Sequence, residues 1–172
     1  MTALATQADA RFVPSLLDAP ADCDKRNSPN YTVDTLTRLR DSLAASSSPF
    51  ALFALLGADS WLDIARWYRA PEMLALCDWI VAARPGYDLT KAERAVPPQV
   101  VLAQVTPEQE PCMVLSHSGK TISRVWILPH TDETTSATNL RGSTPTDGAI
   151  GIAAVEEYVR KTHLYTRGAA ET

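Results

Sequence analysis

The sequence predicts an α/β fold with a parallel β-sheet. Two short, continuously apolar runs, ALFALL at 51–56 and WIVAA at 79–83, are typical of strands that are buried on both faces. A glycine closes the first run, and Arg84-Pro85-Gly86 closes the second. The segment between the runs is long enough for helices. A strand, a helix and a second strand in this order predict a βαβ unit, whose two strands run parallel.

Composition and charge favour one globular domain that spans residues 1–172. The chain has 45% apolar and 21% charged residues and a net charge of −4. No basic run is present, which argues against a nucleic-acid partner. No stretch approaches the ~20 apolar residues of a membrane span, and residues 1–10 do not resemble a signal peptide. We therefore expect a cytoplasmic protein with no membrane partner, and the oligomeric state stays open.

Two further elements are predicted in the first half of the chain. RFVPSLL at 11–17 has the composition of a short strand, which Pro14 would confine to a sheet edge. Residues 31–46 place their valine and leucines near one helical face, with Asp34 four residues before Arg38, and this pattern predicts a helix with that ion pair.

The second half contains a clear terminal helix and a less regular middle. Residues 90–110 indicate only a poor helix and a loop. Residues 112–128 hold two β-rich runs on either side of Ser118-Gly119, which form either a hairpin or two separate strands. At 152–165 the spacing of the apolar residues predicts a helix whose inner face carries Ile152, Val155, Tyr158 and Val159.

Cysteine and histidine spacings predict no metal site. The three cysteines (Cys23, Cys77 and Cys112) lie too far apart for a Cys-x-x-Cys clip, and the three histidines (His117, His130 and His163) complete no zinc pattern. We expect the cysteines to be reduced and not to bind metal. His117, in SHSG, is interpreted as a turn residue.

Residues 57–60 follow the first predicted strand and are candidates for ligand contact. Ligands of open α/β sheets bind beyond the carboxyl ends of the strands, where helix N-termini present free N–H groups. Gly57 would allow a close backbone approach there. Asp59 either caps the following helix or contacts a ligand, and the sequence leaves both interpretations open.

Two tryptophans follow on the next predicted helix. Trp61, Ile64, Ala65 and Tyr68 have helical spacing, so Trp61 is explained as a core residue. Trp67 lies off this face, and Ala70-Pro71 favours a corner between two helices at WYRA. Trp67 either pins the helices together or stacks on a flat ligand ring.

Five motifs, in this order, resemble those of the bacterial nicotinate-nucleotide adenylyltransferases. They span nearly the whole chain: NYTVDTL at 30–36, GADSWLDIARWYR at 57–69, ARPGYDL at 83–89, SATNLR at 136–141 and VEEYVRKTHLY at 155–165. The resemblance implies a Rossmann-like nucleotidyltransferase fold. It also implies transfer of AMP from ATP to nicotinate mononucleotide, which gives deamido-NAD and pyrophosphate in NAD biosynthesis.

The resemblance implies roles for the residues near the first strand. Thr32 would bind the nicotinate carboxylate, and it is also a plausible plain N-cap. Trp67 would stack on the substrate ring, while Tyr68 would offer its backbone N–H to the carboxylate. Gly57 and Asp59 complete the expected nicotinate-nucleotide site.

The resemblance places ATP elsewhere on the chain. Ser136, Thr138 and Arg141 match a Ser-x-Thr-x-x-Arg motif that holds the ATP phosphates, and Arg84 would lie close to the nucleotide. Mg²⁺ would arrive with ATP and would not be held by dedicated protein ligands.

The sequence departs from the family in one respect. The family has a glycine-rich turn with a His-x-Gly-His motif, whose histidines stabilise charge on the transferred group, and no segment here matches it. We therefore expect no catalytic residue in this chain, an N-terminal truncation that removes the first strands, and no activity of the chain alone. The alternative is a non-catalytic nucleotide-binding remnant of the fold.

Overall fold

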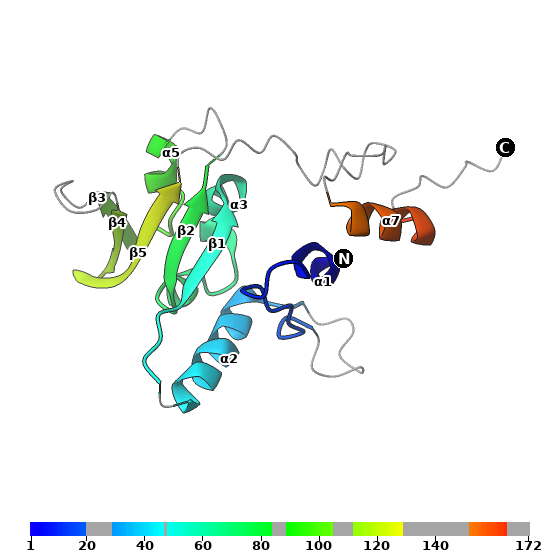
Figure 1. The fold of residues 1–172 in the computed structure, drawn as a ribbon. Coiled ribbons are helices and arrows are strands. Elements are labelled where there is room, and N and C mark those ends of the chain that lie inside the picture. Colours follow the sequence, from blue (N-terminus) through cyan, green and yellow to red (C-terminus); the bar gives the residue numbers. More distant parts are fainter. Residues whose placement is uncertain (20–28, 47, 84–88, 105–111, 129–151, 165–172) are drawn as a thin grey trace. The chain divides into compact units, whose positions relative to one another are not determined.

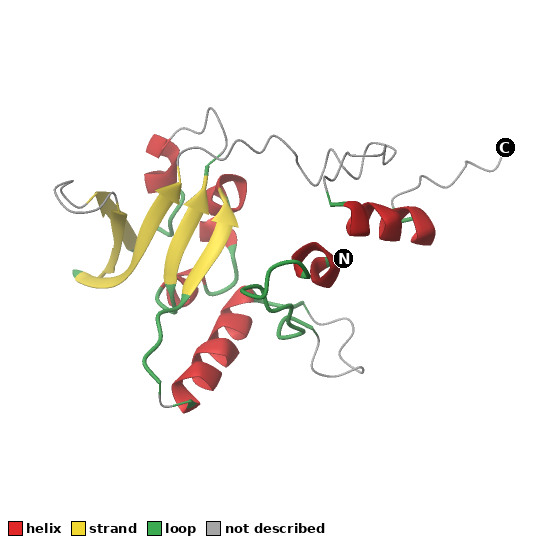
Figure 2. Ribbon diagram, in the orientation of Figure 1, coloured by secondary structure: helices red, strands yellow, loops and turns green. Residues whose placement is uncertain are grey.

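The computed structural model describes residues 1–19, 29–46, 48–83, 89–104, 112–128 and 152–164 (Figures 1 and 2). The chain falls into two compact units. The larger unit is Leu17–Glu133, and the smaller unit joins Met1–Leu16 to Thr134–Thr172. The single domain expected for residues 1–172 stays a prediction.

The larger unit is built on a five-stranded sheet with the strand order β1-β2-β5-β4-β3 (Figure 1). The strands are β1 (Phe53–Gly57), β2 (Asp78–Ala82), β3 (Val100–Gln104), β4 (Cys112–His117) and β5 (Lys120–Leu128). β2 pairs parallel with β1 and with β5, whereas β4 pairs antiparallel with β5 and with β3. The predicted α/β class is confirmed, in the form of a mixed sheet with a parallel half.

The connection from β1 to β2 is helical, as the predicted βαβ unit requires. It contains α3 (Ala58–Leu62), the 3-10 helix η2 (Ile64–Arg66) and α4 (Ala70–Leu74). Trp61 and Ile64 are fully buried, as expected. Ala65 and Tyr68 are exposed, because the chain leaves the α-helix after Leu62 and the periodicity of one long helix is lost. The prediction that all four residues share one buried face is therefore wrong for these two.

One face of the sheet carries the core, and the other face is half-buried over β2 and exposed over β1. On the core face, Trp79, Val81 and Val125 are buried among Trp61, Ile64 and Leu74 of the crossover helices. On the opposite face, Phe53 is 47% exposed and Leu55 69% exposed. The prediction that ALFALL is buried on both faces is therefore wrong, because Phe53 and Leu55 lie on the face opposite the core cluster and no described element buries them there.

Buried polar groups fix the end of α4 to the sheet. The carbonyl oxygen of Leu74 accepts a hydrogen bond from Nε1 of Trp79 at 3.2 Å and another from Oγ of Ser123 at 2.7 Å. The two donors belong to β2 and β5. Because a buried carbonyl without a partner is costly, these bonds favour one position of α4 against the sheet.

The predicted helix at 31–46 is confirmed as α2 (Thr32–Ala45), with Val33 and Leu36 buried. The predicted pair between Asp34 and Arg38 does not form. Arg38 donates instead to Oγ1 of Thr35 at 3.3 Å, and Asp34 lies 3.8 Å from Nη1 of Arg69. Asp34 therefore pairs with Arg69, which lies outside α2, and not with Arg38 four residues further along the helix.

The two β-rich runs at 112–128 form a hairpin, which settles the alternative that the sequence leaves open. Ser118 and Gly119 have φ values of 51° and 76°, as the two central residues of a type I′ turn require. His117 is the exposed last residue of β4 and is paired with Lys120 in the ladder, so it precedes the turn. α5 (Leu89–Arg94) and β3 lie in the segment for which the sequence indicates only a poor helix and a loop.

The strand predicted at 11–17 does not form. These residues have no regular structure apart from turn positions at residues 11 and 17, and Val13 and Leu16 are more than 80% exposed. The predicted terminal helix is confirmed as α7 (Ala153–Thr162), which lies against α1 (Thr2–Thr6) in the smaller unit. Val155 and Val159 are buried as expected, whereas Tyr158 is 41% exposed and Ile152 precedes the helix. None of the helices in the described ranges has the length and apolar composition that a bilayer crossing requires.

Candidate functional site

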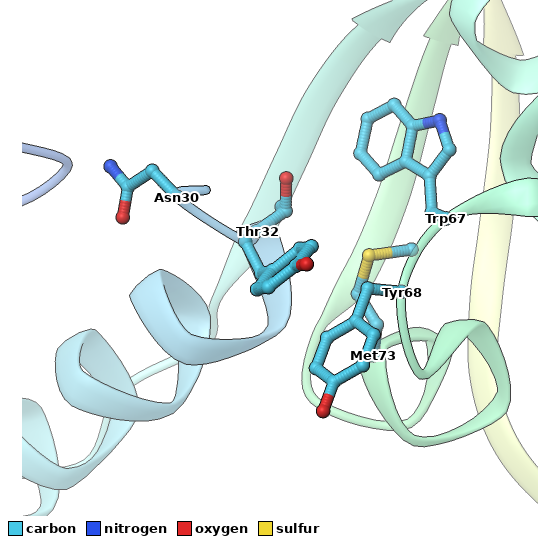
Figure 3. Close-up of a pocket in the computed structure, with 6 residues that line it drawn as sticks. Asn30, Thr32, Trp67, Tyr68 and Met73 are labelled. Atoms are coloured by element: carbon cyan, nitrogen blue, oxygen red, sulfur yellow. The ribbon is translucent and has the colours of Figure 1, made fainter. Parts of the chain in front are cut away.

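A pocket of about 200 Å³ opens in the larger unit between the start of α2 and the corner that joins η2 to α4 (Figure 3). Six residues line it: Asn30, Tyr31, Thr32, Trp67, Tyr68 and Met73. Three of them, Thr32, Trp67 and Tyr68, belong to the nicotinate-nucleotide site that the sequence predicts.

The first wall of the pocket is the N-terminus of α2. Tyr31 is the N-cap residue in an extended conformation, and no side chain caps this end. The carbonyl oxygen of Tyr31 accepts from the amides of Asp34 and Thr35. The amides of Thr32 and Val33 have no acceptor among the described residues, nor does the Thr32 hydroxyl form a hydrogen bond there. Free N–H groups at a helix N-terminus attract anionic groups.

The plain N-cap interpretation of Thr32 is wrong. Thr32 is the first residue inside the helix, and the N-cap position belongs to Tyr31. The hydroxyl of Thr32 is therefore not needed to complete the helix end.

The second wall is an irregular corner between η2 and α4. Trp67 ends η2 in an extended conformation with φ −71° and ψ 147°, and Arg69 adopts the left-handed conformation with φ 52°. Pro71, in the first turn of α4, fits the start of a helix. The corner that Ala70-Pro71 predicts is thus confirmed, and it sends the Trp67 and Tyr68 side chains to the pocket (Figure 3).

Aromatic rings join the two walls. The rings of Tyr31 and Tyr68 lie 4.1 Å apart between centroids with an interplanar angle of 30°. Tyr68 is 51% exposed and Trp67 is half-buried. The Tyr68 amide donates to no backbone carbonyl in the part of the chain that the structure describes. The pocket therefore combines a flat aromatic surface with unpaired donors, which suits an anionic ring.

Met73 is the lining residue that α4 contributes to the pocket. Met73 is fully buried and lies next to Leu74, whose carbonyl oxygen is fixed by Trp79 and Ser123. α4 therefore carries the corner residues on an element that is anchored to the sheet.

Gly57 and Asp59 do not line this pocket. Gly57 is the N-cap residue of α3 and Asp59 is exposed in its first turn, beyond the carboxyl end of β1. No side-chain hydrogen bond caps this helix, so the capping interpretation of Asp59 is wrong. Oδ1 of Asp59 lies 2.5 Å from the place that a Cβ at Gly57 would occupy, so the carboxylate itself makes the close approach to Gly57. A ligand contact of either residue stays a prediction.

The predicted ATP-binding residues lie outside the described residues. These are Arg84, Ser136, Thr138 and Arg141. Their roles stay predictions.

Sequence reasoning missed three residues of the pocket as site residues: Asn30, Tyr31 and Met73. Asn30 and Tyr31 stand directly before Thr32 in the NYTVDTL motif, so their position was a usable signal. No sequence signal marked Met73 as a site residue, because a buried methionine in a short helix has the pattern of an ordinary core residue.

Comparison with known proteins identifies the family of the chain. No protein-family model matches it. Its sequence is 34% identical to a probable nicotinate-nucleotide adenylyltransferase of Chromobacterium violaceum over 172 aligned positions, which cover 96% of this chain and 72% of the relative. The chain belongs to the nicotinate-nucleotide adenylyltransferase family.

Other nicotinate-nucleotide adenylyltransferases support the assignment. A probable member from Pseudomonas fluorescens is 32% identical and covers 82% of this chain, and one from Acidothermus cellulolyticus is 36% identical and covers 61%. The alignments cover 62% and 49% of these two relatives, so the chain spans from 49% to 72% of the length of the three proteins. The resemblance to this family that the sequence motifs predict is confirmed.

Proposed function

We propose that this chain supplies the nicotinate-nucleotide site for the transfer of AMP from ATP to nicotinate mononucleotide, with deamido-NAD and pyrophosphate as products. The observation that carries the proposal is the pocket itself. It joins Thr32, Trp67 and Tyr68, which the family motifs assign to this substrate, although Thr32 lies more than thirty positions before the other two residues in the sequence.

The donors in the pocket suit a carboxylate better than an amide. In this proposal the nicotinate carboxylate accepts from the Thr32 hydroxyl and from the unpaired amides of Thr32 and Tyr68, while the Trp67 indole stacks on the pyridine ring. Nicotinamide would turn its NH₂ group toward these donors and leave at least one of them unpaired. The partly positive N-terminus of α2 favours the anion further.

ATP is the second proposed substrate. We assign its phosphates to Arg84, Ser136, Thr138 and Arg141, since hydroxyls and guanidinium groups hold phosphate oxygens well. Mg²⁺ would come bound to ATP and would neutralise phosphate charge. No three His, Cys, Asp or Glu side chains gather within the described ranges, so these residues offer no cage for the ion. Given the family, we also propose that the protein acts in the cytoplasm.

The alternative function is nucleotide binding without catalysis. One sequence observation favours it: the three histidines at 117, 130 and 163 cannot form a His-x-Gly-His motif. Without such groups, the charge that develops on the transferred phosphoryl group lacks its usual donors. We therefore expect the 172-residue chain alone to bind nicotinate mononucleotide and to form no deamido-NAD.

Calorimetric titration of the chain with nicotinate mononucleotide and with its amide analogue tests the proposed site. We expect the acid to bind at least about tenfold more tightly, because the amide leaves a donor unpaired. Thr32→Ala should reduce this preference. Thr37→Ala is the matched control, because the Thr37 hydroxyl donates to the Val33 carbonyl of the same helix and does not line the pocket. Equal binding of acid and amide would contradict the proposal.

A measurement on the native protein distinguishes the proposed enzyme from the proposed nucleotide-binding protein without catalysis. Its intact mass, taken from its own cells, is compared with the 18.7 kDa of this sequence. A heavier species whose peptides contain the His-x-Gly-His turn and which forms deamido-NAD supports the enzyme. A native mass of 18.7 kDa without turnover supports nucleotide binding alone.

A further inference from the structure

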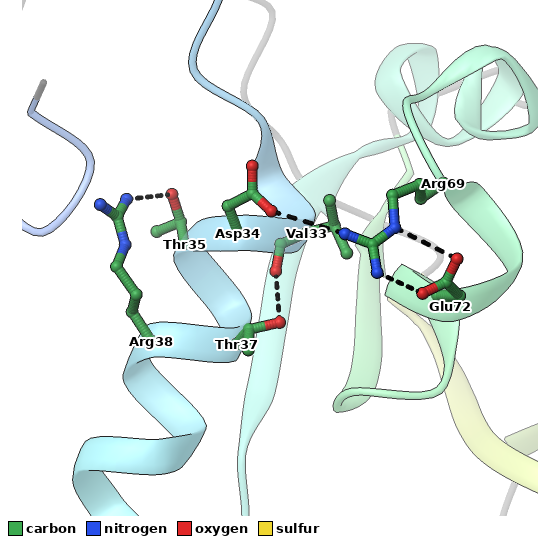
Figure 4. Close-up of polar contacts among 7 residues, drawn as sticks. All are labelled: Val33, Asp34, Thr35, Thr37, Arg38, Arg69 and Glu72. Carbon is green, nitrogen blue, oxygen red and sulfur yellow. Dashed lines mark hydrogen bonds and ion pairs between the residues drawn. The ribbon is translucent and has the colours of Figure 1, made fainter.

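Arg69 connects the two walls of the pocket without lining it. Its Nη1 lies 3.8 Å from Oδ1 of Asp34, in the first turn of α2. Its Nε and Nη2 donate to the two carboxylate oxygens of Glu72, in the first turn of α4, at 3.1 and 2.5 Å. Figure 4 shows the guanidinium between these two carboxylates.

The backbone of Arg69 is part of the same arrangement. Its φ of 52° and ψ of 41° lie in the left-handed region, which a residue with a Cβ rarely adopts. Glycine would adopt this conformation more readily. The corner nevertheless carries an arginine. The backbone conformation does not explain this choice, so we look for the explanation in the contacts of the arginine side chain.

The ionic contacts indicate what this contribution is. Arg69, Asp34 and Glu72 are all partly exposed, and exposed ion pairs add little to the stability of a fold. The bidentate bond to Glu72 instead fixes the direction of the guanidinium, because a planar fork matches a carboxylate in few orientations. So oriented, the guanidinium lies 3.8 Å from the carboxylate of Asp34, two residues after Thr32 in the first turn of α2.

We infer that Arg69 is a positioning residue that sets the separation between the Thr32 wall and the Trp67–Tyr68 wall of the pocket. The inference rests on the proposed function, since it concerns a ligand that contacts both walls at once. Such a ligand depends on the spacing between its ring-stacking and its carboxylate-binding partners. A small change in that spacing weakens one contact or the other.

The test uses Arg69→Gly in the full 172-residue chain. Glycine relieves the left-handed backbone, so the melting temperature should stay constant or rise. Nicotinate mononucleotide should nevertheless bind about tenfold more weakly in a calorimetric titration. Arg69→Lys should recover part of the loss, because it keeps the charge and loses the fork. Arg66→Ala is the matched control, because Arg66 pairs with Asp63 on the same crossover and does not line the pocket. This variant should bind nicotinate mononucleotide as tightly as the unaltered chain does.

Hydrogen exchange of the unliganded chain gives a second readout. The amides of Asp34 and Thr35 donate to the Tyr31 carbonyl on α2, remote in sequence from residue 69. They should exchange faster in Arg69→Gly, and equally fast in Asp34→Asn, because both changes release the same contact. A role confined to the corner would leave these two amides unchanged.

The two failures are distinguishable. If the unaltered chain does not bind nicotinate mononucleotide, the proposed function is overturned. The positioning role of Arg69 is then tested only by the hydrogen exchange of the Asp34 and Thr35 amides. If the unaltered chain binds and Arg69→Gly binds equally well, or if Arg66→Ala loses as much affinity, the inference about Arg69 is overturned.

Discussion

At the scale of single residues, Trp67 shows how a position off the helical pattern becomes part of a site. It is half-buried because the chain leaves the helix after Leu62, and the extended conformation at Trp67 turns its indole to the pocket. A residue on the regular face, such as Trp61, is instead fully buried and donates to the Ala92 carbonyl. The two tryptophans of one motif thus have different tasks.

Trp67→Ala should weaken binding of nicotinate mononucleotide and leave ATP binding unchanged, because it removes a stacking surface from one substrate only. We expect a loss of about 0.5–1.5 kcal/mol in binding free energy. Trp126→Ala is the control, because Trp126 packs against Phe53 on the sheet, away from the pocket. An equal loss for both substrates would remove Trp67 from the nicotinate site.

We expect the folded protein to lose stability at high pH because the thiol of Cys77 is buried. Burial raises the pKa of its thiol from an ordinary value of 9.0 to about 12. The folded protein therefore keeps the thiol protonated where the unfolded chain ionises it. This contribution to stability is fully present below pH 9.0 and is lost as the pH rises toward about 12.

Urea unfolding at several pH values between 8 and 11 measures this effect. The free energy of unfolding should fall more steeply with pH in the unaltered chain than in Cys77→Ala. Cys112→Ala, which removes the less buried of the two free cysteines in the described ranges, should retain the slope of the unaltered chain. Identical slopes for all three proteins would contradict the account of Cys77.

At the scale of elements, the position of α4 governs the corner that precedes it. Ser123 and Trp79 both donate to the Leu74 carbonyl at the end of this helix. Ser123→Ala should lower the free energy of unfolding by about 1–2 kcal/mol, because one of two buried bonds to the carbonyl is lost. Thr121→Ala, at an exposed position of the same strand, should change it by less than about 0.5 kcal/mol. Chemical denaturation compares the two, and equal losses would contradict the anchoring role.

Which elements the sequence predicts depends on how local their signals are. The helices at 32–45 and 153–162 follow from apolar spacing, which is a property of neighbouring residues. At 112–128 the local pattern predicts two β-rich runs around Ser118-Gly119, but only their pairing in the sheet shows that the two runs form a hairpin. β3 was missed because two prolines and a short helix precede it. The strand expected at 11–17 failed because its composition suits a strand but no strand of the described sheet pairs with it.

At the scale of the whole molecule, tertiary contacts decide what the sequence pattern leaves open. The motif residues Thr32, Trp67 and Tyr68 were predicted as parts of one site. The sequence could not predict that Asp34 pairs with Arg69 and not with Arg38, because Arg69 belongs to another element. Likewise the apolar run at 51–56 indicates a strand but not its place at the edge of the sheet.

The edge position of β1 predicts self-association. Leu55 is 69% exposed and Phe53 47% exposed on a strand that pairs only with β2 in the described sheet. Exposed apolar edges promote pairing between molecules. Leu55→Lys should therefore reduce association at high concentration in sedimentation velocity, while Leu62→Lys, at an exposed position on α3, should not. Unchanged association of Leu55→Lys would exclude this edge as its cause.

The proposed function depends on where nicotinate mononucleotide binds. The measurement that tests this most directly is a titration followed by ¹H–¹⁵N correlation spectra of the labelled chain. The largest shifts should occur at the backbone amides of Thr32, Val33 and Tyr68 and at the indole N–H of Trp67. Shifts confined to other residues, with these four signals unmoved, would show that the pocket between α2 and the corner is not the nicotinate-nucleotide site.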